Sequence, residues 1–86
     1  MNAIDENLSF ELETDAYGVA LAAVLNQNSR PVAFFFRTLQ QTERRHPSVE
    51  KEACVIVEAI RHWRHYLTGK HFKLITDQKE VSFIFN

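Results

Sequence analysis

Apolar and polar residues alternate over residues 8–15, and this period of two predicts a β-strand. Residues 19–25, VALAAVL, are compatible with a second strand, although the alanines also allow a helix. The sequence NQNS at 26–29 indicates a turn. Residues 30–37, RPVAFFFR, predict a third strand with Pro31 at its start, where the missing N–H matters least. Together these segments predict a three-stranded antiparallel meander.

A long amphipathic helix is predicted from Pro47 or Ser48 to Leu67. Apolar residues recur at steps of three and four between Val49 and Leu67, as they do on one face of a helix. Proline suits the first helical position, and Gly69 supplies a stop signal.

A fourth strand is predicted at residues 71–77, HFKLITD, and residues 78–86 are expected to begin something helical or irregular. The order β-β-β-α-β predicts an α/β fold with a mixed sheet, in which the helix crosses over to a strand parallel to its neighbour. The phrase Leu-x-Thr-Asp ends both the first strand and the fourth, at Asp15 and Asp77. If these strands are neighbours, the two carboxylates lie side by side at the carboxyl ends of the strands, where ligand sites of open α/β sheets collect.

Glu52 is a third carboxylate that points to the same site. On a helical wheel of roughly 100° per residue, Glu52 falls inside the apolar sector between Ala59 and Trp63, whereas Glu50 falls on the polar side. A carboxylate that faces the sheet needs a partner, and three converging carboxylates require protons or a cation to offset their charges. Hard oxygen ligands suit Mg²⁺ or Mn²⁺. The alternative is that Glu52 lies at the edge of the apolar stripe and reaches water.

The 86 residues allow a single domain spanning 1–86, of which residues 1–7 are expected to be flexible. Hydrophobic residues make up 45% and charged residues 24%, which is typical of a globular chain rather than a disordered one. A formal net charge of −1 excludes a global basic signal for nucleic acid, so any such surface must be local. Arg44, Arg45 and Lys51 are candidates for contact with phosphates, and the alternative is an ordinary solvated helix face.

Cys54 is the single cysteine, which excludes a disulfide framework and favours a reducing, intracellular compartment, either cytoplasmic or nuclear. No stretch is long and apolar enough to span a membrane, so no membrane partner is expected. The first residues, MNAIDEN, do not resemble a signal peptide.

Three stretches, in order, resemble the RNase H domain of the reverse transcriptase/RNase H region in Ty3/gypsy-type retrotransposon polyproteins: ETDAYGVALAAVL, RPVAFFFRTL and ERRHPSVEKEACVIVEAIRHWRHYLTGKHFKLITDQ. The likeness covers residues 8–86. It implies an RNase H-like fold and a nuclease, a hydrolase acting as an endonuclease on the RNA strand of an RNA–DNA hybrid, with magnesium ions held by four acidic residues. Carried over by motif, three of these catalytic metal ligands are Asp15 of ETDA, Glu52 of EKEA and Asp77 of ITDQ.

The family's fourth acidic residue would fall beyond Asn86, so the resemblance implies a C-terminally truncated domain with one complete metal site and one incomplete site. Whether this chain is an active enzyme is therefore left open, and the resemblance implies impaired hydrolysis. The alternative is a non-catalytic, domesticated RNase H-like module for protein interaction or self-association. The incomplete C-terminal half is also expected to leave apolar groups such as Phe83 and Phe85 exposed, which favours a homo-oligomer.

Overall fold

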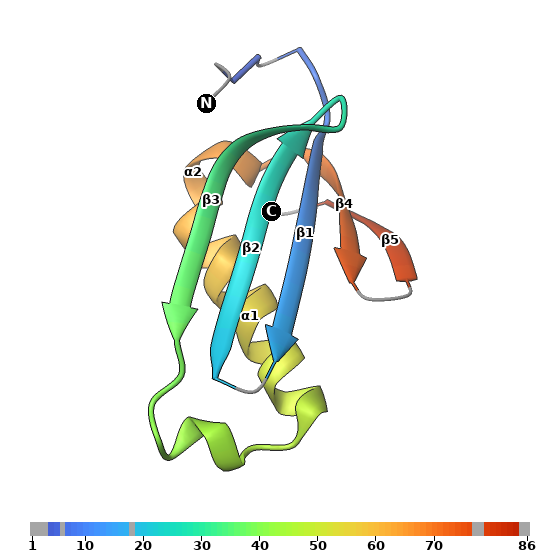
Figure 1. The fold of residues 1–86 in the computed structure, drawn as a ribbon. Helices are drawn as coiled ribbons and strands as arrows, with labels where there is room; N and C mark the ends of the chain where they lie inside the picture. Colours follow the sequence, from blue (N-terminus) through green and yellow to red (C-terminus); the bar gives the residue numbers. More distant parts are fainter. Residues whose placement is uncertain (1–3, 6, 18, 77–78, 85–86) are drawn as a thin grey trace.

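The computed structural model describes residues 4–5, 7–17, 19–76 and 79–84. They form a five-stranded sheet in the order β3-β2-β1-β4-β5, with helices against one of its faces (Figure 1). The strands are β1 (Phe10–Tyr17), β2 (Ala20–Gln27), β3 (Arg30–Thr38), β4 (His71–Thr76) and β5 (Lys79–Ile84). The first three strands form the predicted antiparallel meander, and β4 runs parallel to β1. The predicted mixed sheet with a parallel pair is therefore confirmed.

The hairpin between β2 and β3 is accompanied by an irregularity that affects which side chains of β3 face the core. Its two turn residues, Asn28 and Ser29, have φ angles of 52° and 61°, the left-handed conformation of the turns that suit twisted hairpins. A register shift between Leu25 and Asn26 follows in the β2–β3 ladder. Opposite this irregularity Val32 is buried, although its neighbours in sequence are more exposed.

The helical segment consists of a 3-10 turn η1 (Glu43–Arg45), α1 (Ser48–His62) and α2 (Arg64–Leu67). α1 begins directly after Pro47, as predicted. The predicted single helix as far as Leu67 is interrupted at Trp63, whose φ of −110° and ψ of 20° are not helical. The carbonyl of Trp63 accepts the N–H groups of Tyr66 and Leu67, and these bonds start α2.

The helical segment ends close to Gly69, which was the predicted stop signal. Its φ of 75° is a left-handed conformation that glycine adopts without steric cost. No helix in the described part of the chain is long and apolar enough to cross a membrane.

Residues 79–84 form β5, so the expectation of a helical or irregular segment at 78–86 is wrong for the part that the structure describes. β5 runs antiparallel to β4, with Leu74 opposite Val81. Residues 81–83 of KEVSFI alternate between apolar and polar, and its valine, phenylalanine and isoleucine favour strands. Pairing with β5 also gives partners to the backbone groups on the outer edge of β4.

The core lies between the sheet and α1. Its buried side chains form one cluster: Phe10, Leu12, Leu21, Ala23, Leu25, Val32, Leu39, Val55, Ala59, Trp63, Leu67, Phe72 and Leu74. The buried residues Val55 and Ala59 of α1 and Trp63, directly after the helix, follow one another at steps of four. Val49 was expected in this stripe but is 75% exposed, because the stripe centres on Ala59, roughly 80° away on the wheel. Val55, in contrast, is fully buried.

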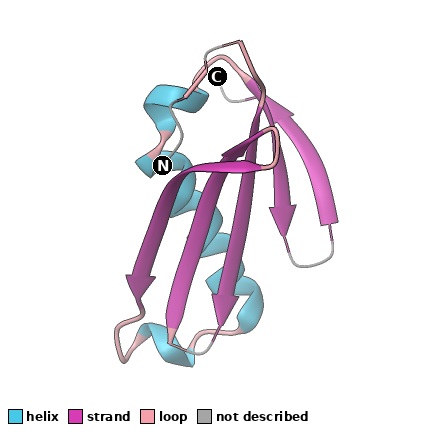
Figure 2. Cartoon of the chain, turned by 45° about the horizontal axis from the view of Figure 1, so that its top comes forward, coloured by secondary structure: helices cyan, strands magenta, loops and turns pink. Residues whose placement is uncertain are grey.

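Figure 2 shows the helices gathered on one side of the sheet. The other face carries no helix in the described part of the chain, and Phe34 and Phe36 of β3 are 61% and 65% exposed. Phe85 and the side chain of Phe83 lie outside the described residues, so their exposure stays a prediction.

The segment before β1 is held by Gln27, whose side chain is buried at the end of β2. The side-chain amide of Gln27 donates to the carbonyl oxygens of Asp5 and Leu8 at 2.7 and 3.1 Å, and its oxygen accepts the N–H of Asp5 at 2.9 Å. The described residues of this segment are therefore anchored to the sheet. The remaining residues, 1–3 and 6, lie outside the description.

Leu12→Ala should lower the free energy of unfolding by about 2–5 kcal/mol, because it removes a fully buried side chain from the strand between β2 and β4. Val19→Ala, at a side chain that is 49% exposed, should change it by less than about 0.5 kcal/mol. Urea denaturation followed by circular dichroism measures both variants. Equal effects would contradict the described core.

Candidate metal centre and nucleic-acid interface

The C-terminal end of β1, the turn η1 and the N-terminal end of α1 lie at the same end of the sheet (Figure 1). β1 carries Asp15 near this end, and the beginning of α1 carries Glu52. α1 packs against β1 and β2, which fixes its first turns beside the end of β1. The fold therefore brings two of the three predicted metal ligands to one end of the sheet.

Asp15 is exposed and lies on the face of β1 opposite the core. Phe10 and Leu12, at the alternate positions of the strand, are buried on the face that α1 covers. In the antiparallel ladder Asp15 lies opposite Ala22 of β2. Its carboxylate is thus open to solvent near the carboxyl end of a central strand, where ligand sites of open sheets collect.

Glu52 is also exposed, so the expectation that it is a buried carboxylate facing the sheet is wrong. On the wheel Glu52 still belongs to the sheet-facing stripe, since it lies roughly 20° from Ala59. The first buried residue of that stripe among the described side chains is Val55, one turn after Glu52. Glu52 is exposed because the stripe extends beyond the core at this end of the sheet.

Asp15 and Glu52 differ from the other described acidic side chains because they have no hydrogen-bond or ion-pair partner in the described part of the chain. Each of the others is engaged: Asp5 by the N–H of Asn7, Glu11 by the N–H of Ser29, Glu13 by the side-chain amide of Asn26, Glu50 by His46, and Glu43 and Glu58 by Arg37. The oxygens of Asp15 and Glu52 are therefore available to an external ligand. Carboxylate oxygens are the ligands that hard divalent cations take.

Asp77, the third predicted ligand, lies outside the described residues. The parallel ladder of β1 and β4 is described as far as Glu13 opposite Ile75. Among the described residues, no group of three or more His, Cys, Asp or Glu side chains is placed to hold a metal ion. The complete site of three carboxylates therefore stays a prediction.

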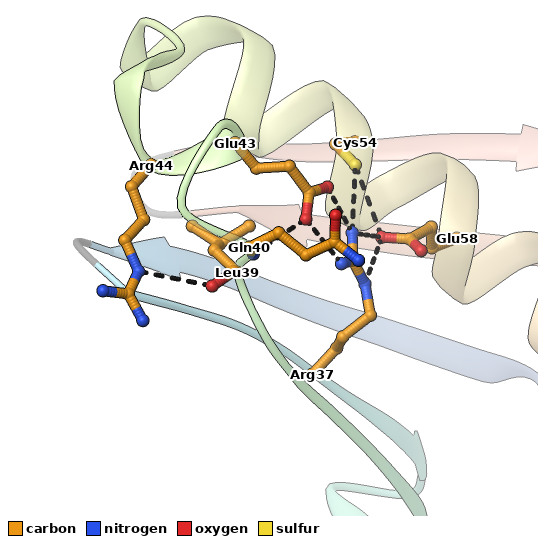
Figure 3. A network of polar contacts seen from close by, with 7 residues as sticks. All are labelled: Arg37, Leu39, Gln40, Glu43, Arg44, Cys54 and Glu58. Carbon is orange, nitrogen blue, oxygen red and sulfur yellow. Dashed lines mark hydrogen bonds and ion pairs between the residues drawn. The ribbon is translucent and has the colours of Figure 1, made fainter.

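Arg37 of β3 links the sheet to both η1 and α1 (Figure 3). Its guanidinium donates to the two carboxylate oxygens of Glu43, both at 2.9 Å, and to Oε2 of Glu58 at 2.8 and 3.2 Å. The thiol of Cys54 donates to the same oxygen of Glu58 at 3.3 Å. Forked guanidinium–carboxylate pairs fix orientation as well as distance. This network holds the middle of α1, and the connection before the helix, against β3.

The network shifts the pKa of three of its groups. The hydrogen bonds from Arg37, and then that from the N–H of Gln40, lower the pKa of Glu43 from 4.5 to about 2. The hydrogen bonds to Glu43 and to Glu58 raise the pKa of Arg37 above its ordinary value. Burial, followed by the hydrogen bond to Glu58, raises the pKa of the Cys54 thiol. A thiol with a raised pKa is a poor nucleophile, so Cys54 serves as a structural donor.

The predicted phosphate contacts lie at the same end of the sheet as Asp15 and Glu52. Arg44 and Arg45 belong to η1, and both are exposed. Nε of Arg44 donates to the carbonyl oxygen of Leu39 at 3.3 Å, whereas Lys51 in α1 is half-buried and already interacts with another group of the chain. Arg45 is therefore the most accessible of the three predicted cations.

The sequence profile of the RNase H-like domain found in reverse transcriptase matches residues 5–86. The chain belongs to this family. The family predicted from the ordered motifs is thus confirmed, while its assignment to the Ty3/gypsy type stays a prediction.

Relatives of this RNase H-like domain are transposon polyproteins. Over 82 residues it is 40% identical to the retrovirus-related Pol polyprotein from transposon 297 of Drosophila melanogaster, which covers 95% of this chain and 8% of that protein. Over 77 residues it is 35% identical to the transposon Tf2-3 polyprotein of Schizosaccharomyces pombe, which covers 81% of this chain and 6% of that protein. The chain therefore spans less than a tenth of the length of these relatives.

The fold is similar to that of a foamy viral protease–reverse transcriptase, solved in complex with double-stranded DNA. The TM-score is 0.75, and the match covers 84% of this chain and 14% of the viral chain. Because the sequence identity is 14%, this likeness supports the RNase H-like fold alone.

The Arg37 network of this RNase H-like domain was not predicted from the sequence. Arg37 follows three phenylalanines, and no regular spacing joins it to Glu58, which lies twenty-one residues later. One signal was present, because Ala33 and Phe35 share the period of two with Arg37 and are packed against the core. That period places Arg37 on the face that the helices cover, where a cation needs a carboxylate partner.

Glu43→Gln should make the RNase H-like domain less sensitive to acid. Because the pKa of Glu43 is about 2 in the folded chain, below its ordinary 4.5, its carboxylate stabilises the fold above the ordinary value, and this contribution is lost as the pH falls toward 2. Thermal unfolding at about pH 6 and about pH 3 should show a smaller drop in Tm for the variant than for the unmodified chain. Glu50→Gln, on the surface of α1, is the control and should keep the full drop. An equal drop in all three proteins would contradict this role of Glu43.

Proposed function

We propose that this RNase H-like domain hydrolyses the RNA strand of an RNA–DNA hybrid in a reaction that depends on Mg²⁺ or Mn²⁺, with Asp15, Glu52 and Asp77 as metal ligands. The observation that carries the proposal is that the carboxylates of Asp15 and Glu52 have no partner in the described part of the chain. Alone among the acidic side chains that the structure describes, they keep their oxygens without a partner, and they lie at one end of the sheet. Membership of the RNase H-like family supports the same chemistry.

The sequence supplies a third carboxylate for this end of the sheet. Glu13 lies opposite Ile75 in the parallel ladder, and Asp15 and Asp77 each follow two residues later. The proposal therefore expects the carboxylate of Asp77 beside that of Asp15. Three carboxylates at one place repel one another, and a divalent cation offsets their charge.

The chain's own residues would position the reactants. Asp15, Glu52 and Asp77 would hold the divalent cation, which would supply Lewis-acid chemistry at the phosphate of the hybrid. Asp15 lies on a central strand and Glu52 on a helix fixed by the core and by Arg37, and rigid elements of this kind hold ligand geometry well. Arg44 and Arg45 would orient the hybrid through its phosphates. The three carboxylates would fill one of the two ion sites that the family resemblance implies.

Asp15→Asn and Glu52→Gln should each abolish Mg²⁺ binding and lower hybrid cleavage by more than about 100-fold. Losing a residue that only supports a metal ligand lowers activity by up to about 100-fold, and losing the ligand itself should lower it further. Amide NMR during a Mg²⁺ titration reports binding, and a labelled RNA–DNA hybrid reports cleavage. Glu50→Gln is the matched control, because Glu50 is exposed on the same helix but falls roughly 160° from Glu52 on the wheel.

The two readouts separate the possible outcomes. Metal binding without cleavage in the unmodified chain would keep the metal site and remove the hydrolytic function from these 86 residues. The absence of any Mg²⁺-dependent shift around the carboxylates would contradict the proposal and favour the non-catalytic interaction module.

Arg45→Gln should weaken hybrid binding equally for all sequences and reduce the slope of log K against log salt by about 1, as expected for one lost phosphate contact. Arg45 is chosen because the side chain of Arg44 also bonds Leu39. Arg30→Gln is the control, since Arg30 is exposed at the beginning of β3, at the other end of the sheet from η1 (Figure 1). Fluorescence anisotropy over a salt series measures both slopes. An unchanged slope in the Arg45 variant would remove Arg45 from the interface.

A further inference from the structure

The face of the sheet that carries no described helix exposes aromatic side chains on β3 and acidic side chains on β1. Phe34 and Phe36, two residues apart on the edge strand β3, are 61% and 65% exposed. Neighbouring exposed aromatic side chains of this size mark an interaction surface. Two rows of laterally paired residues run from them across the sheet: Phe34–Val24–Glu13 and Phe36–Ala22–Asp15. The name sheet patch is used here for Ala22, Val24, Phe34, Phe36 and Glu13.

The carboxylates of β1 restrict the kind of partner that fits the sheet patch. Glu11, Glu13 and Asp15 follow one another on the same face of β1, where Lys73 of β4 lies beside Glu11, and Glu13 and Asp15 form no ion pair in the described part of the chain. Without a metal ion at Asp15, this row of carboxylates would repel the phosphates of a nucleic acid. An apolar surface edged with cations would be attracted to it, because complementary charge steers and aligns association.

α1 presents such a surface on its solvent side. Val49, Ala53 and Val57 follow one another at steps of four and are all exposed, Val49 by 75% and Val57 by 47%. Arg61 continues the row by one more step, and Arg64, the first residue of α2, follows after the break at Trp63; both are exposed and without an ion pair in the described residues. Polar residues are the rule on the solvent face of an amphipathic helix, so this aliphatic row is unusual. The name helix stripe is used for these five residues.

We propose that the helix stripe of one copy of this chain docks on the sheet patch of a second copy. Val57 would cover Phe34 and Phe36, and Arg61 would pair with Glu13. The helix rises about 6 Å from Val57 to Arg61. Two strand spacings, about 9.6 Å, separate β3 from β1, and the long side chain of arginine spans the difference. A helix on this face of the sheet would mirror the packing of α1 on the other face.

The two surfaces differ, so the contact is head-to-tail. Every added copy leaves one helix stripe and one sheet patch unoccupied, and the assembly grows with concentration unless a ring closes. The ion pairs at the edge of the contact are screened by salt, whereas the aromatic contact persists. This contact uses β3 and α1, and it does not involve the C-terminal phenylalanines that the sequence singled out.

Sedimentation velocity from micromolar to submillimolar concentration tests the proposal. The unmodified chain should show a mass that rises beyond a dimer, and less steeply at high salt. Phe34→Thr with Phe36→Thr removes the sheet patch with residues that still favour a strand. Arg61→Glu with Arg64→Glu inverts the charge of the helix stripe with a good helix former. Each double variant should stay monomeric and keep the circular dichroism of the unmodified chain.

Mixing the two double variants tests whether the two surfaces meet. The phenylalanine variant keeps an intact helix stripe, and the arginine variant keeps an intact sheet patch. An equimolar mixture should therefore form a 1:1 heterodimer that grows no further. Arg30→Glu, at an exposed cation outside both surfaces, is the control and should associate like the unmodified chain.

Three results would overturn the proposal. An unmodified chain that stays monomeric would mean that the sheet patch has another occupant. Self-association of the arginine variant alone would mean that the sheet patch pairs with itself, and a mixture that stays monomeric would mean that the two surfaces do not meet. If the double phenylalanine variant fails to fold, Phe34→Thr alone takes its place in the mixture and should weaken the self-association of the chain.

Discussion

The contact between Ala59 and the sheet determines how α1 is turned, and with it the position of the candidate ligand Glu52. Ala59 is fully buried, and its small side chain lets α1 approach β1 and β2 closely. Val55 and Trp63, one turn to either side, then set the rotation of the helix, and burying an aliphatic residue such as Val55 stabilises the fold by about 1.5–3 kcal/mol. With this rotation Glu52 comes to the end of the sheet, and the exposed aliphatic row comes to the solvent side.

Arg37 adds a directional contact to this apolar packing. Burial of apolar surface has no preferred direction, so it tolerates small rotations of a helix, whereas a forked guanidinium fixes its partners in angle and distance. Glu58 and Cys54 lie one turn apart on α1 and both contact the guanidinium of Arg37, so a rotation of the helix would break both contacts. The side chains of Arg37 and Glu58 remain about a third exposed, so solvent screens the pair and its main effect is on orientation.

The local pattern of apolar and polar residues was sufficient to predict most of the fold, because this pattern repeats with different periods in strands and in helices. A period of two predicted β1, and steps of three and four residues predicted α1. The predicted rotation of α1 was wrong because a helical wheel treats all apolar residues alike. In the structure Ala59 packs against the sheet, and Val49 is exposed to solvent. The same limit explains Glu52, which has the predicted direction but lies beyond the core that would bury it. Arg37 was missed because its partner Glu58 is twenty-one residues away.

The candidate metal ligands could be predicted from the sequence for a different reason. Asp15 and Glu52 were found from motif and helix position, and the structure adds that neither has a partner among the described residues. The net charge does not reveal such unpaired carboxylates, because a chain of charge −1 can still hold carboxylates that no cation of its own offsets. Asp15 also ends the row that begins at Phe36, so β1 contributes to both proposed contacts. A copy docked on the sheet patch would therefore crowd a hybrid at Asp15, whereas a metal ion needs the carboxylate oxygens alone and would compete far less.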